Sequence, residues 1–335
     1  MNYRKNNKVS IQFSEIGFGA WGIGGVTRGP TSYGEVQYKT AIDALNSALN
    51  NGITYYDTSN VYGAGESEKR IADAFSSIRY DVIIGTKAGL ISYDSRPDYK
   101  VNSIQSSIHS SLKRLRTDYI DILYLHNVTI DELQEVSELS IFLDKLKLEG
   151  KIRSIGLSLP NLNSAKYLIK TFNPDFLQFN FNMIDWRILD DGIFDYCEKK
   201  GCSIVARTPL ASGFLTSEIT PNTNFNNNDH RSRYSKKLIH KLLEFRRELV
   251  GELSIESSLL YEYAIRFCLS FSNIVTVIPG ILSAQEALTN AAISDLGPLN
   301  QKEINLIRQV YDKYSNDISI LIKSNVKDAK LGNKK

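Results

Sequence analysis

Short apolar runs alternate with segments of helical periodicity along nearly all of this 335-residue chain. Eight runs rich in β-branched and aromatic residues are expected to be strands, centred near Ile16, Tyr55, Ile83, Leu123, Ile155, Leu177, Val205 and Val275. Between them, apolar residues recur every three or four positions, as in 38–49, 104–115 and 139–146, which predicts amphipathic helices. A strand followed by a helix, eight times over, predicts an α/β fold, the closed (β/α)8 TIM barrel, rather than an open six-stranded sheet.

The domain organisation follows from the same series. No proline-rich or glycine-serine linker interrupts it, so residues 1–322 are expected to form one barrel domain. Residues 323–335 are basic and are expected to be a disordered tail. Two connections are long, 88–100 and 211–235, and both fall on the carboxyl-end face, where barrel active sites lie. Loops of this length are usually lids or solvated inserts, and we favour lids.

Composition and charge exclude several classes of protein. The net charge is +3, but both termini are basic and the body between them is about −4, which argues against a nucleic-acid partner. The sequence contains no run of 18 apolar residues, so no membrane span is predicted. The first residues contain no apolar signal segment, and the three cysteines are odd in number and fit free thiols, so a cytoplasmic location is expected. The oligomeric state is left open.

Four ionisable side chains stand at or just beyond the ends of consecutive strand candidates. Asp57 ends one strand, Tyr62 follows five residues later, Lys87 ends the next strand and His126 the one after. Because the carboxyl ends of parallel strands meet at one face, these groups should share a pocket. A phenol donates a proton poorly near neutral pH unless a nearby cation lowers its pKa, which Lys87 is expected to do. The alternative is a structural ion pair with a core histidine, and the presence of all four groups favours catalysis.

This constellation resembles the aldo-keto reductase superfamily, of the bacterial type, over nearly the whole chain. The matching segments are Gly17–Gly22, Asp57–Gly63 with Glu66–Glu68, Thr86–Lys87, Leu125–His126, Ile155–Ser158, Gln178–Asn180, Pro209–Gly213, Ile278–Gly280 and Asn290. The resemblance implies an NAD(P)H-dependent oxidoreductase that reduces an aldehyde or ketone, a small-molecule carbonyl substrate, to the alcohol. Tyr62 would be the general acid, Lys87 held by Asp57 would lower its pKa, and His126 would orient the carbonyl.

The resemblance also implies a cofactor site and a substrate site. The expected cofactor-binding residues are Gly19, Ala20, Trp21, Asp57, Ser158, Leu159, Gln178, Arg207, Thr208, Pro209, Leu210, Ser212, Gly213, Gly280, Ile281, Leu282, Glu286, Thr289 and Asn290. The expected substrate residues are Trp21, Tyr62, Tyr93 and His126.

Four positions depart from the family pattern. Leu159 replaces an asparagine that contacts the nicotinamide carboxamide, and Arg207 replaces an aromatic residue that stacks on the ring. Leu282 and Glu286 stand where basic residues often bind the 2′-phosphate of NADP, so the choice between NADP and NAD stays open. The substrate is expected to be a sugar or sugar-derived carbonyl on the breadth of the family alone.

Three rival interpretations were weighed. Gly17-x-Gly19-x-x-Gly22 fits a dinucleotide fingerprint, but no helix opens at its third glycine, so a Rossmann site is not expected. A metal-dependent hydrolase is excluded because the four histidines are dispersed, and no metal is expected. The remaining alternative is a nucleotide-sensing regulatory subunit of the same fold with little turnover, which the catalytic residues alone do not exclude.

Overall fold

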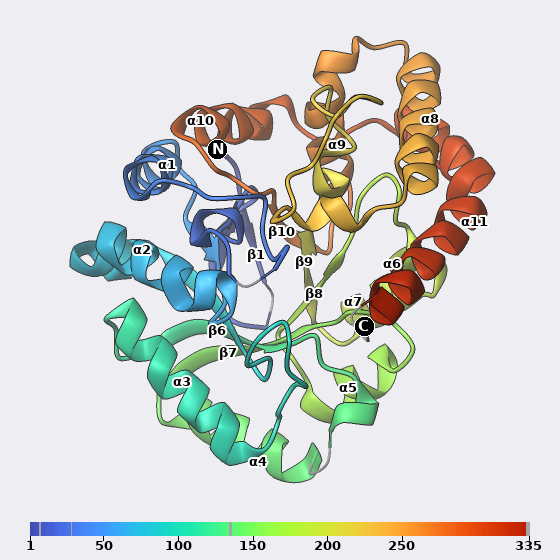
Figure 1. Cartoon of the computed structure of the whole chain (residues 1–335). Helices are drawn as coiled ribbons and strands as arrows, with labels where there is room; N and C mark the ends of the chain where they lie inside the picture. Colours follow the sequence, from blue (N-terminus) through green and yellow to red (C-terminus); the bar gives the residue numbers. More distant parts are fainter. Residues whose placement is uncertain (7, 28, 134–135, 333–335) are drawn as a thin grey trace.

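Eight parallel strands follow one another around the fold in the order in which they occur in the chain (Figure 1). The computed structural model describes residues 1–6, 8–27, 29–133 and 136–332, with side chains up to residue 324. The strands of the ring are β3 Phe18–Gly19, β4 Tyr55–Asp57, β5 Ile83–Ala88, β6 Ile120–His126, β7 Ile152–Ser158, β8 Phe176–Asn180, β9 Ser203–Arg207 and β10 Ile274–Ile278. Parallel bridges from Ile16 to Val277 and from Gly19 to Gly280 join the first strand to the last, so the ring closes. The prediction of a (β/α)8 barrel is confirmed.

Helices surround the barrel on its outer side (Figure 1). Those in the described residues are α1 Tyr38–Asn50, α2 Glu66–Phe75, α3 Val101–Leu115, α4 Val136–Leu148, α5 Ala165–Phe172, α6 Arg187–Asp190, α7 Ile193–Lys199, α8 Lys236–Leu253, α9 Leu260–Leu269, α10 Ala284–Ile293 and α11 Gln301–Gly332. The segments with helical periodicity fall within α1, α3 and α4. Gly150 has a positive φ of 71° just past the end of α4, as a helix C-terminus often requires.

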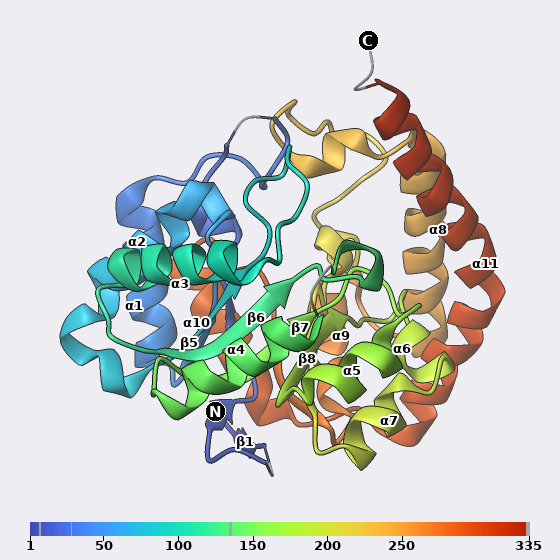
Figure 2. The same ribbon diagram turned by 90° about the horizontal axis from the view of Figure 1, so that it is seen from below.

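A short hairpin closes the amino-terminal end of the barrel, as Figure 2 shows around the label β1. Its strands, β1 Tyr3–Lys5 and β2 Gln12–Ser14, pair antiparallel. Phe13 is fully buried, and its ring centroid lies 5.2 Å from those of Tyr55 and Phe176 inside the barrel. The hairpin was not predicted, because strands of three residues are too short to show a period in the sequence.

The barrel interior holds two fully buried tyrosines, Tyr55 on β4 and Tyr124 on β6. Glycines on neighbouring strands make room for their rings. A Cβ atom at Gly85 would lie 2.5 Å from the Tyr55 hydroxyl oxygen, and one at Gly156 would lie 2.3 Å from Cδ1 of Tyr124. Barrel interiors are usually filled by branched aliphatic residues in layers. Here two phenol rings fill part of that volume, and two glycines leave the space that the rings occupy.

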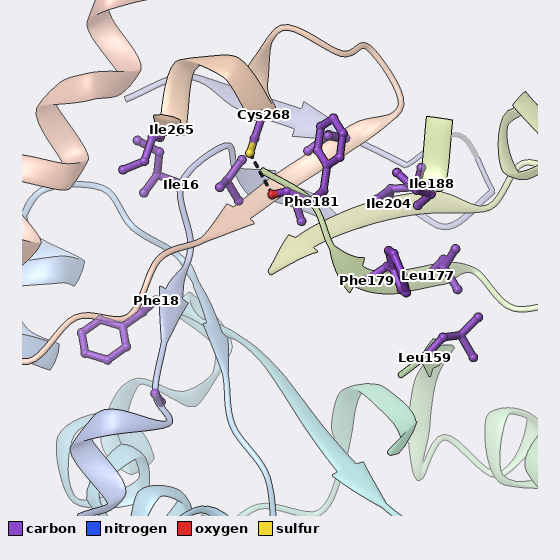
Figure 3. Close-up of a cluster of buried hydrophobic side chains, with 14 of the residues drawn as sticks. Ile16, Phe18, Leu159, Leu177, Phe179, Phe181, Ile188, Ile204, Ile265 and Cys268 are labelled. Carbon is purple, nitrogen blue, oxygen red and sulfur yellow. Dashed lines mark hydrogen bonds between the residues drawn. The ribbon is translucent and has the colours of Figure 1, made fainter. Parts of the chain in front are cut away.

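A larger apolar core lies between the strands and the helices, part of which is drawn in Figure 3. Ile16, Phe18, Leu177 and Phe179 contribute to it from the strands. Cys268 of α9 also lies in this core, and its thiol donates to the Phe181 carbonyl at 3.2 Å. Burial of this apolar surface against the helices is the main stabilising term for such a fold.

The carboxyl-terminal helix packs beside α8 along one flank (Figure 2). Its backbone continues as helix to Gly332, past Lys323, where the sequence predicts the start of a disordered tail. The described part of the predicted tail is therefore helical, and residues 333–335 lie outside the described residues. The division into a barrel and a tail stays a prediction.

Candidate active site

Asp57 and Lys87 form a buried ion pair at the carboxyl end of β4 and β5. The Lys87 Nζ atom lies 2.6 Å from Asp57 Oδ1 and donates to the Thr58 carbonyl at 2.7 Å. Lys87 is fully buried, and burial lowers its pKa while the Asp57 carboxylate opposes that change. Parallel pairing of the two strands fixes the distance between the side chains, so the pair is rigid.

The second oxygen of Asp57 is also occupied. Gln178 on β8 donates from Nε2 to Asp57 Oδ2 at 2.6 Å, and the Tyr55 hydroxyl donates to the same oxygen at 3.3 Å. Tyr124 lies next in line, with its hydroxyl oxygen 3.1 Å from that of Tyr55. The sequence assigned Gln178 to the carboxamide of a cofactor. In the structure its amide holds Asp57 and accepts a hydrogen bond from Ser158.

Tyr62 opens a 3-10 turn, Tyr62–Gly65, just beyond β4. The centroid of its ring lies 4.7 Å from Lys87 Nζ and 6.1 Å from the His126 ring. The turn depends on Gly63, which has a φ of 59° and whose added Cβ would lie 1.9 Å from the Gly24 carbonyl oxygen. The Gly63 backbone thus packs directly against the loop after β3, which keeps the phenol near the pair.

The electrostatics of Tyr62 differ from the sequence expectation. Burial raises the pKa of the Tyr62 phenol above its ordinary value, the Asp57 carboxylate adds to that rise, and the Arg207 guanidinium opposes it. The net direction is thus opposite to the predicted lowering, and the contribution of Lys87 itself stays a prediction. Asp57 offsets part of the Lys87 charge, and the ammonium still lies 4.7 Å from the centroid of the Tyr62 ring.

His126 ends β6 and is buried beside Tyr62. Its Nδ1 atom lies 3.2 Å from the Ser59 hydroxyl oxygen, and its carbonyl accepts from the Tyr99 hydroxyl at 2.7 Å. Burial lowers the pKa of the imidazole well below its usual value, and the charges of Lys87 and Arg207 lower it further. The ring is therefore neutral near pH 7.

Arg207, the last residue of β9, spans the ends of β7 and β8. Its guanidinium donates to Asn180 Oδ1 at 2.8 Å, to the Ser158 hydroxyl at 3.1 Å and to the Leu159 carbonyl at 2.9 Å. Leu159 contributes only its backbone, since its side chain is fully buried in the core. At position 159 no polar side chain therefore takes the place of the asparagine found in the family.

A cavity of about 200 Å³ lies where these residues meet. It is lined by Gly19, Trp21, Tyr33, Asp57, Tyr62, Gln178, Asn180, Arg207, Thr208, Ile278 and Gly280. Eight of these were assigned to a site from the sequence. Tyr33, Asn180 and Ile278 were not among the assigned residues. Asn180 stands in the quoted Gln178–Asn180 motif, so that signal was available, whereas Tyr33 stands in a loop with no motif.

The loop after β9 crosses to the loop after β3 and covers one side of this cavity. Asp229 forms a parallel bridge with Ser32, and the His230 amide donates to the Ser32 carbonyl at 3.0 Å. The His230 ring centroid lies 4.8 Å from those of both Trp21 and Tyr33. Burial lowers the pKa of His230 to about 4, so it packs as a neutral ring. Part of the predicted 211–235 segment therefore lies at the mouth of the cavity.

Several assigned residues lie outside the lining of this cavity. They are Ala20, Ser158, Leu159, Pro209, Leu210, Ser212, Gly213, Ile281, Leu282, Glu286, Thr289 and Asn290 for the cofactor, and Tyr93 and His126 for the substrate. Tyr93, in the 88–100 connection, lines a separate cavity of about 130 Å³ with Val61 and Ile91. His126 instead contacts the Tyr62 ring from the strand side.

Backbone amides at the start of α10 are hydrogen-bonded to side chains of the same segment. Ser283 caps the helix by accepting from the Glu286 amide at 3.1 Å, and the Glu286 carboxylate accepts from the Leu282 amide at 2.7 Å. This reciprocal capping uses backbone donors that a phosphate would otherwise contact. No basic side chain takes part in it.

The described residues contain no group of three or more histidine, cysteine, aspartate or glutamate side chains arranged to hold a metal ion. Across the same ranges, none of the helices has the length and apolarity needed to cross a membrane.

Comparison with known proteins agrees with this arrangement. The model of the Aldo/keto reductase family matches residues 15–312. L-Galactose dehydrogenase of Arabidopsis thaliana is 28% identical over 311 residues, covering 90% of this chain and 91% of that protein. The NADH-specific methylglyoxal reductase of Escherichia coli (strain K12) is 26% identical over 320 residues, covering 90% and 96%. The holo form of aldo-keto reductase AKR11C1 from Bacillus halodurans matches with a TM-score of 0.77 at 26% identity, covering 92% and 96%.

Proposed function

Because this chain belongs to the aldo/keto reductase family, we propose that it reduces the carbonyl group of a small aldehyde or ketone with a hydride from NADH or NADPH. The observation that carries the proposal is the position of the Tyr62 phenol. It lies at a cavity beside a buried Lys87–Asp57 pair and a neutral His126. A redox reaction at a carbonyl needs a proton donor at its oxygen and space for a hydride donor at its carbon, and this cavity offers both.

Tyr62 is the proposed general acid. Its raised pKa keeps the phenol protonated near neutral pH, which is the state that carbonyl reduction requires. In the described residues its hydroxyl makes no hydrogen bond, so the group is available to a substrate oxygen. General-acid assistance of this kind contributes about 10²–10⁴-fold.

Lys87 and His126 support that proton transfer. The ammonium of Lys87 faces the Tyr62 ring and offsets part of the negative charge that appears on the phenol as the proton leaves. The neutral His126 ring is held through Nδ1 by Ser59, which leaves Nε2 to hydrogen-bond the substrate. Asp57 positions Lys87, because its Oδ1 atom accepts from the ammonium while Gln178 fixes its Oδ2 atom.

A nicotinamide nucleotide fits the remaining residues. A cavity of about 200 Å³ has room for one ring beside a small carbonyl compound, and its lining includes Gly19 and Gly280, which bridge the first and last strands of the ring. Arg207, Asn180 and Thr208 would face the ring, and the start of α10 would hold the adenosine end. When bound, the nucleotide supplies the hydride. Since Glu286 brings a carboxylate to the α10 end, we propose that NADH is used at least as well as NADPH.

A small, oxygen-rich substrate suits the site. The cavity walls carry amides, hydroxyls and the guanidinium of Arg207 as well as the aromatic rings of Trp21 and Tyr33. Polar groups of this kind hydrogen-bond hydroxylated compounds, and the rings pack on their carbon faces. We therefore propose a sugar-derived or similarly short oxygenated carbonyl, in keeping with the substrates named for two relatives.

The test is a titration followed by a turnover assay. Purified protein is titrated with NADH and NADPH, and the tighter nucleotide is then used with methylglyoxal, a sugar aldehyde and an aromatic aldehyde. We expect nucleotide binding and measurable reduction of at least one short oxygenated carbonyl. Tight binding without turnover on any of the three would support the regulatory subunit instead. Absence of binding would overturn both.

A further inference from the structure

Arg207 carries a positive charge that no carboxylate balances. Its three acceptors are the amide oxygen of Asn180, the hydroxyl of Ser158 and the carbonyl of Leu159, all of them neutral. Across the described ranges no carboxylate lies within 4.0 Å of this guanidinium, whereas Lys87 in the same site is paired with Asp57 at 2.6 Å. An arginine cannot discharge by losing its proton at accessible pH. The charge is therefore a lasting property of the cavity wall.

A charged side chain in a cavity is unfavourable unless a ligand in that cavity interacts with the charge. Arg207 is half-buried, and its exposed part faces the cavity that it lines. A ligand that fills the cavity excludes water from around the guanidinium, and the charge then acts on the ligand through a medium of lower polarity.

The charged groups around Arg207 pair with one another and leave its charge in excess. Asp57 is the only carboxylate of the described cavity lining, and it is already paired with Lys87. Burial and the nearby Lys87 charge lower the pKa of His126 most, and the Arg207 charge lowers it further. The same Arg207 charge opposes the rise in the pKa of Tyr62. Asp185 also faces the guanidinium, but it pairs with Arg187 at 2.6 Å.

Tyr62 and Arg207 line the same cavity. In the proposed reaction the nicotinamide must lie within contact of the carbonyl carbon whose oxygen Tyr62 protonates. It therefore shares the cavity with Arg207. The nicotinamide ring is uncharged in the reduced nucleotide and positively charged in the oxidised one.

We propose that Arg207 makes this site selective for the redox state of its nucleotide, admitting the reduced form and repelling the oxidised form. The inference rests on the proposed function and assigns to Arg207 a specificity that the proton-transfer groups do not explain. Repulsion speeds the departure of the oxidised nucleotide after reduction. It also biases the bound reactants toward reduction over alcohol oxidation.

A different role for Arg207 predicts a different result. If the residue only braced the strand ends, its hydrogen-bonding fork would matter and its charge would not. Lysine keeps the charge but has no planar fork, and glutamine keeps hydrogen-bonding capacity without charge. The two substitutions therefore separate the roles.

The experiment measures dissociation constants by fluorescence titration with the reduced nucleotide and by competition with its oxidised form. It uses the wild-type protein, Arg207→Gln and Arg207→Lys, each checked for folding by circular dichroism and thermal unfolding. Arg187→Gln is the matched control, because that neighbouring arginine is already paired with Asp185.

We expect the wild-type protein to bind the reduced form about tenfold more tightly than the oxidised one, or better. Arg207→Gln should lower this ratio by about tenfold, chiefly through tighter binding of the oxidised form. Arg207→Lys and Arg187→Gln should leave the ratio within about threefold of wild type. An unchanged ratio in Arg207→Gln, or an equal loss in Arg207→Lys, would overturn this inference and leave the proposed function standing. Failure of the wild-type protein to bind either form would overturn both.

Discussion

Asp57 and Gln178, 121 positions apart in the chain, are joined by a hydrogen bond of 2.6 Å across the barrel mouth. With Lys87 on the other oxygen, both oxygens of Asp57 accept hydrogen bonds from the protein. The carboxylate is thus a fixed support, and the residues that hold it matter through their effect on Lys87 and Tyr62. Tyr55 is one of these residues and was not assigned to the site from the sequence.

Tyr55→Phe removes one hydroxyl from this support and keeps the ring. We expect a loss of about 1–2 kcal/mol in the free energy of unfolding, since the Tyr124 hydroxyl loses its partner, and a several-fold fall in kcat. Tyr124→Phe is the control, because its hydroxyl contacts Tyr55 and not Asp57. It should cost similar stability and leave kcat near wild type. Equal kcat losses in both variants would show a general effect of barrel packing.

Tyr62→Phe tests the proton donor. Reduction should fall by about 10²-fold or more, the contribution expected of a general acid. Because the Tyr62 hydroxyl makes no hydrogen bond in the described residues, thermal stability and nucleotide affinity should change little. Single-turnover rates and nucleotide titration measure the two effects separately. Activity near one-tenth of wild type or higher would assign the proton transfer to another group.

The pH dependence follows from the raised pKa of Tyr62. A raised pKa keeps the phenol protonated to higher pH, so reduction should stay level from neutral pH to beyond about 9. Alcohol oxidation needs the phenolate and should rise across the alkaline range. Lys87→Met leaves the Asp57 carboxylate unpaired, which raises the pKa of Tyr62 further and should move the oxidation limb to higher pH while lowering both rates. Rate profiles in both directions at saturating nucleotide test this. A reduction limb that falls below pH 8 would contradict it.

Nucleotide preference is expected to depend on the Glu286 carboxylate at the start of α10. NADH should be used at least comparably with NADPH. Glu286→Gln keeps an oxygen that can accept from the Leu282 amide but removes the charge, so it should tighten NADPH binding by about threefold and leave NADH unchanged. Dissociation constants for both nucleotides measure the effect. A wild-type preference of about a hundredfold for NADPH, roughly 2.7 kcal/mol, would show that a basic residue from elsewhere reaches the phosphate.

The sequence predicted the barrel and the positions of its ionisable groups, because both depend on local patterns. Apolar runs mark strands, and residues that end parallel strands meet at one face, so Asp57, Lys87 and His126 could be placed together. The direction of the Tyr62 pKa could not be predicted, since it depends first on the burial of the phenol and then on the charges of Asp57 and Arg207 around it. Tyr33 reaches the cavity from an irregular loop that lacks any periodic signal. The helical backbone from 323 to 332 continues α11, where a basic composition alone suggested disorder.

Gly85→Ala should destabilise the barrel, because the added methyl group would lie 2.5 Å from the Tyr55 hydroxyl oxygen. Overpacking of a buried site typically costs about 1–3 kcal/mol in the free energy of unfolding. The penalty should be smaller by about 1 kcal/mol in the Tyr55→Phe background, since the closest atom is then absent. Denaturant unfolding of the two single variants and the double variant measures this coupling. Additive effects would show that the barrel relaxes around the methyl group without involving residue 55.

The Tyr55 side chain occupies space that is free because residue 85 is a glycine. This relationship affects the order in which residues 55 and 85 can change. Loss of the Tyr55 hydroxyl removes a hydrogen-bond partner of Tyr124, whereas a methyl group at residue 85 would meet that hydroxyl at 2.5 Å. The second change is therefore easier after the first, and residues 55 and 85 act as one unit of the barrel interior.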